Sequence, residues 1–288
     1  MIIADLLSAL FTSILLTRVC RDIIINRFVS FQRACLETKE NIKTGSKLLI
    51  GNIGGTLIIG IVRQTIEIKW GIEEFGKVSF ALSISNMMIL FVSAVSLALY
   101  PVIKNKKERE LRKFFSVAGC ISRSFIYILL LIYFPMKYVL DLWLPQYHSS
   151  MHFLGILFPI CLFDGLYYFL VATYLKALRK ENIIMYINWA AVLSEMLLLL
   201  FIKDYLILVI VSIPVILALR CHMGIAYVSG KLNVEFLFDN IFEDILIIVF
   251  TVAAWNESIV GIILYLFLYS FFLVKKCRDL KKIPSYFK

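Results

Sequence analysis

The chain has 288 residues, of which 61% are hydrophobic and only 17% are charged, and its mean hydropathy is +0.87. A soluble globular domain is about half apolar and about a quarter charged, so this composition excludes an ordinary soluble protein. The formal net charge of +10 would suggest a nucleic-acid partner for a soluble chain. In a membrane protein it instead reflects which loops carry Lys and Arg, and we expect a lipid bilayer and no nucleic acid around this chain.

Apolar runs of roughly 20 residues, the length that an α-helix needs to cross ~30 Å of hydrocarbon, recur along the chain. Their continuous apolarity, without alternation, favours helices over the strands of a barrel. The sequence therefore predicts an all-α, polytopic membrane helix bundle with about nine transmembrane helices. The predicted spans are residues 2–20, 47–67, 79–102, 114–135, 152–175, 182–202, 205–226, 242–255 and 257–275. The last two are separated by a tight turn at Asn256-Glu257, because the apolar run there is too long for one untilted span.

The longest stretch between spans, residues 21–46, interleaves isoleucine and phenylalanine with arginine. Ile23, Ile24, Ile25 and Phe28 lie among Arg21, Arg27 and Arg33. This pattern predicts a helix that lies in the membrane interface. A solvated connector is the alternative.

Basic residues alternate between the loops of the predicted bundle. One set of loops and the C-terminal tail hold 24 of the 30 Lys and Arg, with Arg220 and Lys231 counted among them. The alternate loops hold only Lys69, Lys77, Lys137 and Lys203. The positive-inside rule then predicts a multi-pass protein of the cell membrane with a cytoplasmic C-terminus and an external N-terminus. An external Met1 just ahead of a span suggests that earlier spans are missing.

Ionisable residues inside the predicted spans each cost about 2.5–3.5 kcal/mol at a helix centre, so each needs a reason. The candidates are Arg63, Glu67, Arg123, Asp164 and Glu195, to which Asn52, Asn86 and Asn188 add uncharged polar groups. In the functional interpretation they line a hydrated cavity, where Arg63 and Arg123 attract an anionic head group and Asp164 or Glu195 carries a proton or cation. In the structural interpretation they form ion pairs between helices, such as Arg123 with Asp164.

Four further features have mainly structural interpretations. Gly51 and Gly55 form a GxxxG pattern, for which close helix packing is the expected role. His148 and His152 have the spacing of metal ligands on a helix, but no third ligand is evident, so no metal is expected. Glu235, Asp239, Glu243 and Asp244 are expected on a solvated face, and Pro159 and Pro214 are expected to kink their spans.

No P-loop, dinucleotide fingerprint, HExxH or GxSxG motif occurs, so we expect no cofactor, no catalytic residues and no enzymatic activity. The six cysteines show no paired spacing and are interpreted as thiols.

Two blocks of the chain resemble a known family. These are GIEEFGKVSFALSISNMMILFVSAVSLALYPVIK (residues 71–104), preceded by IVRQTIEIKWG, and VLDLWLPQYHSSMHFLGILFPICLFDGLYYFLVATYLKALRKEN (residues 139–182). Both are similar to the polysaccharide-repeat-unit flippases, of the O-antigen or capsule (Wzx) type, in the MOP exporter superfamily. Over the rest of the chain, the likeness lies in the pattern of predicted spans and loops.

The resemblance implies a MOP/MATE-like C-terminal lobe. Residues 1–20 would be the last helix of an incomplete N-terminal lobe, residues 21–46 the connector, 47–226 the six-helix C-terminal lobe, and 227–288 an additional helix pair with a basic tail. Alternating access needs two halves, so the implied partner is a missing N-terminal half or a second copy.

The implied substrate is an undecaprenyl-diphosphate-linked oligosaccharide, with Arg63 and Arg123 facing the diphosphate and Lys176 at the cytoplasmic mouth. The alternatives are a multidrug cation antiporter of the same superfamily and, less favoured, a membrane-embedded polysaccharide polymerase or acyltransferase.

Overall fold

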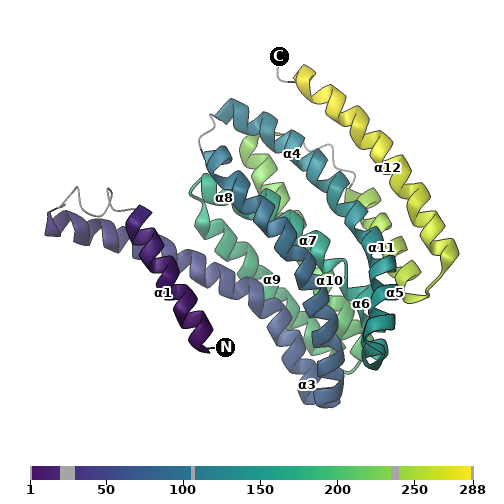
Figure 1. Cartoon of the computed structure of the whole chain (residues 1–288). Helices are drawn as coiled ribbons and strands as arrows, with labels where there is room; N and C mark the ends of the chain where they lie inside the picture. The colour runs from purple at the N-terminus through teal and green to yellow at the C-terminus, as the bar shows by residue number, and fades with distance from the viewer. Residues whose placement is uncertain (1, 20–29, 105–107, 235–239, 287–288) are drawn as a thin grey trace. The chain divides into compact units, whose positions relative to one another are not determined.

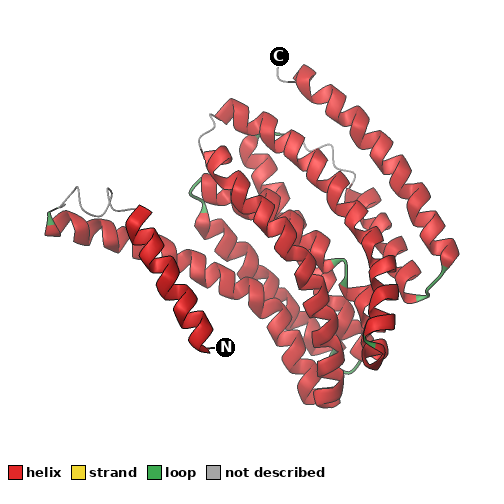
Figure 2. Cartoon of the chain, in the orientation of Figure 1, coloured by secondary structure: helices red, strands yellow, loops and turns green. Residues whose placement is uncertain are grey.

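The computed structural model describes residues 2–19, 30–104, 108–234 and 240–286, and every regular element in those ranges is a helix (Figure 2). The all-α prediction is therefore confirmed. The chain divides into two compact units, Met1–Ser46 and Lys47–Lys288. Residues 20–29, which include Ile23, Ile24, Ile25 and Phe28 of the predicted interfacial helix, lie outside the described residues. From Phe31 onward the same stretch is helical and continues into the second unit.

Most of the described helices are labelled in Figure 1. The described helices are α1 (Ile2–Val19), α3 (Phe31–Lys104), α4 (Glu108–Leu129), η1 (Leu130–Ile132), α5 (Tyr133–Trp143), η2 (Pro145–Tyr147), α6 (His148–Leu157), α7 (Ile160–Leu166), η3 (Tyr167–Ala172), α8 (Thr173–Ala177), α9 (Glu181–Ile202), α10 (Leu206–Leu232), α11 (Asn240–Trp255) and α12 (Ile259–Tyr286).

Helix α3 folds back on itself at Gly71. That residue has φ 86° and ψ 178°, a backbone conformation that a residue with a Cβ rarely adopts, so the helix reverses there. Across the reversal, Arg63 Nε donates a hydrogen bond of 3.1 Å to Ser79 Oγ, and the Arg63 guanidinium lies 5.0 Å from the centre of the Phe75 ring. The predicted spans 47–67 and 79–102 are thus the two halves of one hairpin, which we call the α3 hairpin.

The remaining helices of the second unit pack around a continuous apolar core. Helices α9 and α10 are neighbours, α10 also contacts α6, α7 and η3, and the C-terminal pair α11–α12 packs against α4 (Figure 1). The predicted span 152–175 is broken twice. Pro159 separates α6 from α7, since proline cannot continue the hydrogen-bond ladder, and Tyr167–Ala172 forms a π-helical turn.

Six of the described helices are long and apolar enough to cross a membrane, which supports a multi-pass membrane protein. They are Gln32–Lys104, Glu110–Trp143, Ile160–Ala177, Glu181–Ile202, Leu206–Leu232 and Ile259–Arg278. The first contains both halves of the α3 hairpin. Helices α1 and α11, of 18 and 16 residues, correspond to the predicted spans 2–20 and 242–255 and are not among the six. The count of nine stays a prediction.

One end of the bundle collects the Gly71 reversal and the turns that follow α5, α9 and α11. Ion pairs bind these turns together: Lys69 pairs with Asp204, and Lys137 pairs with Glu257. The Phe80 and Tyr147 rings stack with centroids 4.3 Å apart. We call this the Gly71 end.

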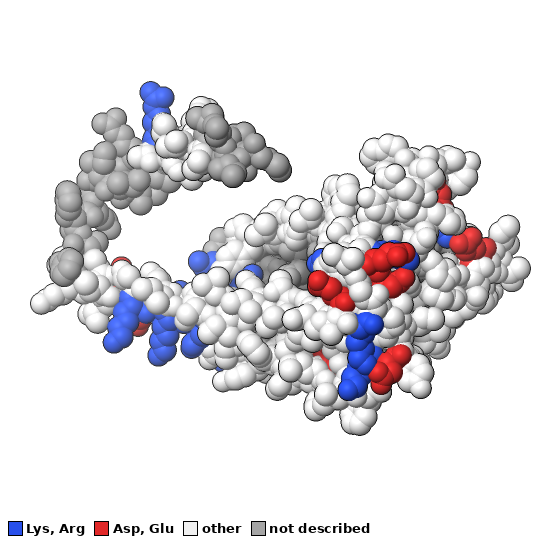
Figure 3. All heavy atoms as spheres, turned by 90° about the horizontal axis from the view of Figure 1, so that it is seen from below, with Lys and Arg blue, Asp and Glu red and all other residues white. Residues whose placement is uncertain are grey.

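Seen from below, charged side chains occupy a small part of the surface, and acidic and basic groups touch in several places (Figure 3).

Candidate functional site

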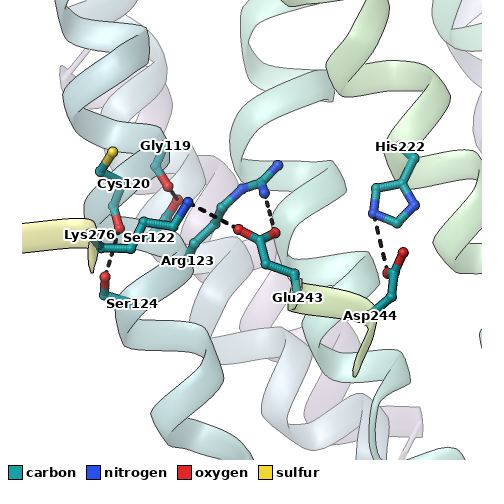
Figure 4. Close-up of polar contacts among 9 residues, drawn as sticks. All are labelled: Gly119, Cys120, Ser122, Arg123, Ser124, His222, Glu243, Asp244 and Lys276. Atoms are coloured by element: carbon teal, nitrogen blue, oxygen red, sulfur yellow. Dashed lines mark hydrogen bonds and ion pairs between the residues drawn. The ribbon is translucent and has the colours of Figure 1, made fainter. Parts of the chain in front are cut away.

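Three charged side chains meet in the interior where α4, α11 and α12 pack together (Figure 4). Arg123 Nη1 donates to Glu243 Oε2, and Lys276 Nζ lies 3.1 Å from Glu243 Oε1. Arg123, Glu243 and Lys276 are 1%, 2% and 4% exposed. We call these three residues the buried triad. It carries two positive charges and one negative charge, and it ties the C-terminal helix pair to α4.

The helices around the buried triad are held by tyrosines. Tyr265 Oη donates to the Tyr127 carbonyl and Tyr269 Oη donates to the Ser124 carbonyl, each at 2.8 Å. The Lys276 ammonium also lies 5.2 Å from the centre of the Phe272 ring. These bonds satisfy buried polar groups along α12 and fix its register against α4, which places Lys276 next to Glu243.

A second buried ion pair joins α10 to α7. Arg220 Nη2 donates to Asp164 Oδ1, and the Arg220 guanidinium lies 4.2 Å from the centre of the Tyr167 ring. Arg220 is 1% and Asp164 7% exposed. Cys221 is buried between this pair and the buried triad, close enough to interact electrostatically with Arg220, Asp164, Arg123 and Glu243.

The predicted pairing of the intramembrane charges is wrong. Arg123 pairs with Glu243 rather than with Asp164, and Asp164 pairs with Arg220. Arg220 was expected in a basic loop and is instead well inside α10, because that helix extends to Leu232.

Glu243 was expected on a solvated face and is buried, while its neighbour Asp244 lies 3.7 Å from His222 Nε2 and stays partly exposed. Glu235 and Asp239 lie outside the described residues. Glu243 is in the first turn of α11, where an acidic residue is ordinarily assigned to the loop, so the sequence offers no signal of its burial.

The GxxxG pattern packs α3 against α9, as the structural interpretation predicts. A Cβ on Gly51 would lie 3.3 Å from the Met185 backbone, and one on Gly54 would lie 3.3 Å from the Asn188 side chain. Asn188 Nδ2 donates to the Gly51 carbonyl at 2.8 Å, and Trp189 Nε1 donates to the Ile50 carbonyl at 3.2 Å. Asn188 is therefore a helix-packing residue rather than part of an open surface.

The other polar candidates on the α3 hairpin lie on its outer surface. On the first half they recur every three to four residues and so share one helix face: Asn52, Thr56, Arg63 and Glu67. On the second half the same spacing aligns Ser79, Ser83 and Asn86. Arg63 and Ser79 are half-buried and the other five are exposed. The hydrogen bond between Arg63 and Ser79 joins the two rows into one surface, which we call the polar stripe.

Exposed apolar side chains share the face of the polar stripe on the second half of the hairpin. Met87 and Leu90, which are 56% and 68% exposed, follow Ser83 and Asn86 by four residues each. Exposed amide and hydroxyl groups are unfavourable in hydrocarbon, whereas exposed methionine and leucine are not. The α3 hairpin thus presents exposed polar groups among exposed apolar side chains.

The last candidates occupy separate places. Lys176 is half-buried in α8, and Glu195 is fully buried in α9, where Ser212 of α10 contacts it. His148 Nδ1 lies 3.0 Å from Asp141 Oδ1, and the His152 ring lies 3.6 Å from the Trp255 ring. Within the part of the chain that the structure describes, no group of three or more metal-ligating side chains occurs. The two histidines take part in contacts at the Gly71 end.

Comparison of the chain with models of known protein families, with curated proteins and with solved structures finds no match.

Proposed function

We propose that the chain is part of a transporter that moves a lipid-linked oligosaccharide, an undecaprenyl-diphosphate-linked sugar unit, across the cell membrane. The observation that supports this most is the polar stripe. The amide side chains of Asn52 and Asn86 are donors and acceptors that suit sugar hydroxyls. The hydroxyls of Thr56 and Ser83 donate to carbonyls of their own helix and add acceptors. These four side chains are exposed along helices apolar enough to lie in the membrane.

Arg63 is the cation that the polar stripe offers to the diphosphate. Its guanidinium is half-buried, and in the described structure its Nε donates to Ser79, which leaves the planar fork oriented by a neighbour on the same surface. Arginine binds phosphate oxygens through two parallel hydrogen bonds, whereas lysine acts as a point charge. Arg123 no longer belongs to this proposal, because it lies in the buried triad.

The proposal is tested by transport of a fluorescent undecaprenyl-diphosphate-linked sugar in vesicles that contain the full chain, together with any N-terminal half encoded beside it. We expect Asn86→Leu and Arg63→Ala to reduce transport at least tenfold at normal protein abundance. Met87→Leu is the matched control, because Met87 is exposed next to Asn86 in the sequence and the substitution keeps the side chain apolar. Unchanged transport in Asn86→Leu and Arg63→Ala would overturn the assignment of the polar stripe.

A further inference from the structure

Between α9 and α10 lies a carboxyl group that has no counter-ion among the residues that the structure describes. Glu195 is 0% exposed, and its Oε1 lies 2.6 Å from Ser212 Oγ. Its Oε2 is buried and has no hydrogen-bond partner among the described residues. A buried carboxylate ordinarily has a cation or several donors beside it, because transferring an isolated charge out of water costs many kcal/mol. Glu195 differs in this from Asp164 and Glu243, which both have cationic partners.

The hydrogen atoms around Ser212 indicate the charge state of Glu195. Ser212 Oγ lies 2.8 Å from the Val209 carbonyl oxygen and 2.6 Å from Glu195 Oε1. A serine hydroxyl has a single hydrogen, and a carbonyl oxygen has none to donate. If the hydroxyl hydrogen is donated to Val209, the hydrogen in the shorter contact must come from Glu195. A protonated Glu195 satisfies both contacts, whereas an ionised Glu195 leaves two acceptors competing for one hydrogen.

Nearby helices do not supply a charge for Glu195. The titratable groups of α10 that follow Ser212 most closely in the sequence are Arg220, Cys221 and His222; those of α8, which also contacts α9, are Tyr174 and Lys176; those on the facing half of the α3 hairpin are Arg63 and Glu67. Arg220 pairs with Asp164, His222 lies beside Asp244, and Arg63 donates to Ser79. Arg220 is also eight residues beyond Ser212 on α10, about 12 Å along the helix axis.

Glu195 and Arg63 lie at about the same depth in the bundle. A Cβ on Gly55 would lie 3.5 Å from Asn188 Nδ2, so Gly55 on α3 and Asn188 on α9 are level with each other. Glu195 is seven residues beyond Asn188 and Arg63 is eight beyond Gly55, which is about 10–12 Å along each helix. A change of charge at Glu195 would therefore occur at the level of the cation that the proposed function assigns to the substrate diphosphate.

We propose that Glu195 and Ser212 form a proton-binding site, occupied when α9 and α10 are packed together and emptied when they separate. In the release step the O–H bond of Glu195 breaks, the electron pair stays on the carboxylate, and the proton passes to a water molecule that enters between the helices. The carboxylate then favours the hydrated, separated arrangement. This inference rests on the proposed function only in linking the proton to the transport cycle.

Infrared spectroscopy tests the site without reference to transport. Purified full chain in phosphatidylcholine vesicles is titrated with alkali, and the difference spectrum is searched for the carbonyl stretch of a protonated carboxylic acid. We expect a band that disappears as pH rises, is absent in Glu195→Gln and is shifted in Ser212→Ala. Glu67→Gln is the control and should keep the band, because Glu67 is exposed on α3. If wild type and Glu195→Gln give identical spectra, Glu195 is ionised and the inference is overturned.

Stability gives a second measure. Glutamine keeps the shape of a protonated glutamate and can donate to Ser212, so Glu195→Gln should unfold at the same temperature as wild type in acid. As pH rises, wild type should lose stability and the variant should not, because only wild type binds a proton that its unfolded chain releases. A Glu195→Gln variant that is much less stable than wild type at every pH would contradict a neutral Glu195. If Glu195→Gln does not fold, the shift of the infrared band in Ser212→Ala still tests the site.

Transport distinguishes this inference from the proposed function. If both hold, a gradient of one pH unit should change the wild-type rate by up to about tenfold and leave the rate of Glu195→Gln unchanged. A Glu195-dependent infrared band in a chain that moves no lipid-linked sugar would refute the proposed function and leave the proton site standing. If transport depends equally on pH in wild type and Glu195→Gln, Glu195 does not couple proton movement to transport.

Discussion

At the scale of single residues, the buried triad shows how the membrane interior accommodates charge. Arg123 and Lys276 both approach the Glu243 carboxylate, and all three side chains are almost fully buried. Removing one member leaves a buried charge without its opposite charge. This costs more free energy of folding than replacing the whole set with apolar residues. The buried triad therefore links the folding of α4 to that of α11 and α12.

We predict that Glu243→Gln lowers the free energy of unfolding by about 3–5 kcal/mol, the range for breaking a buried ion pair. The measurement is thermal or denaturant unfolding of the purified chain in detergent. Arg63→Ala is the control, because Arg63 is half-buried on the outer surface of α3 and should change stability much less. A fall below about 1 kcal/mol in Glu243→Gln would show that the triad contributes little to the fold.

At the scale of the elements, α3 and α9 approach closely because glycines face α9. A Cβ on Gly51 would meet the Met185 backbone at 3.3 Å, and backbone cannot move aside as a flexible side chain can. Gly60, on the same helix, has nothing within 4 Å of an added Cβ. Gly51→Ala should therefore separate the helices slightly and weaken the Asn188 hydrogen bond to the Gly51 carbonyl.

The expected result is that Gly51→Ala lowers the unfolding temperature, whereas Gly60→Ala raises it, since alanine is a better helix former than glycine by about 1 kcal/mol. Parallel thermal unfolding of the two variants checks this. If both variants are stabilised equally, α3 and α9 do not pack as described.

The turn between α11 and α12 is held at the Gly71 end by Lys137. Its hydrogen bond and positive charge lower the pKa of the Glu257 carboxyl below its usual value. A carboxyl whose pKa is lowered in the folded chain contributes stability above its unfolded pKa and loses it as pH falls through the folded value. The Glu257 side chain is 64% exposed, so solvent screens the pair and its contribution is at most about 0.5 kcal/mol.

Lys137→Ala should therefore raise the pKa of Glu257 toward its usual value. The free energy of unfolding should then decrease slightly less as pH falls. NMR titration of the Glu257 carboxyl carbon measures the pKa directly. Glu257 also has a positive φ of 50°, so Glu257→Ala would confuse the result and Lys137 is the better position to change.

At the scale of the whole molecule, the chain alternates between two ends. The Gly71 reversal and the turns after α5, α9 and α11 gather at one end, and the connections after α3, α8 and α10 belong to the other. Lys104, Arg179, Lys180 and Lys231 are at or beside the second group. This agrees in pattern with the predicted bias of Lys and Arg, which assigns the second end to the cytoplasm.

Reporter fusions test the predicted orientation. Green fluorescent protein fused after Arg179 should fluoresce, and alkaline phosphatase fused there should be inactive. Fusions after Lys203 should give the opposite result, as that position lies at the Gly71 end beside Asp204. Equal reporter activities at the two positions, or the reversed pattern, would refute the predicted orientation.

Hydrophobicity predicted the extents of some helices well, but it missed that α3 begins at Phe31 and that α10 continues to Leu232, and it predicted polar contacts poorly. The span predicted at 182–202 is α9 at Glu181–Ile202, because a long apolar run bounded by charges has little freedom in where it ends. The partners of Arg123 and Asp164 could not be predicted, since each depends on the rotation and depth of helices that are distant in sequence. Arg220 was missed because α10 continues beyond the predicted end of its span, and Glu243 because it lies in the first turn of α11, where a charged residue is ordinarily assigned to water.

Glu243 follows Arg123 by 120 residues, and this separation has a consequence for how the chain is made. A ribosome adds about 5–20 residues per second, so roughly 6 to 24 s pass between the synthesis of Arg123 and that of Glu243. During that interval α4 carries a guanidinium whose carboxylate does not yet exist. A chain stopped before α11 would keep α4 in that state, and it is the product that membrane quality control should remove fastest.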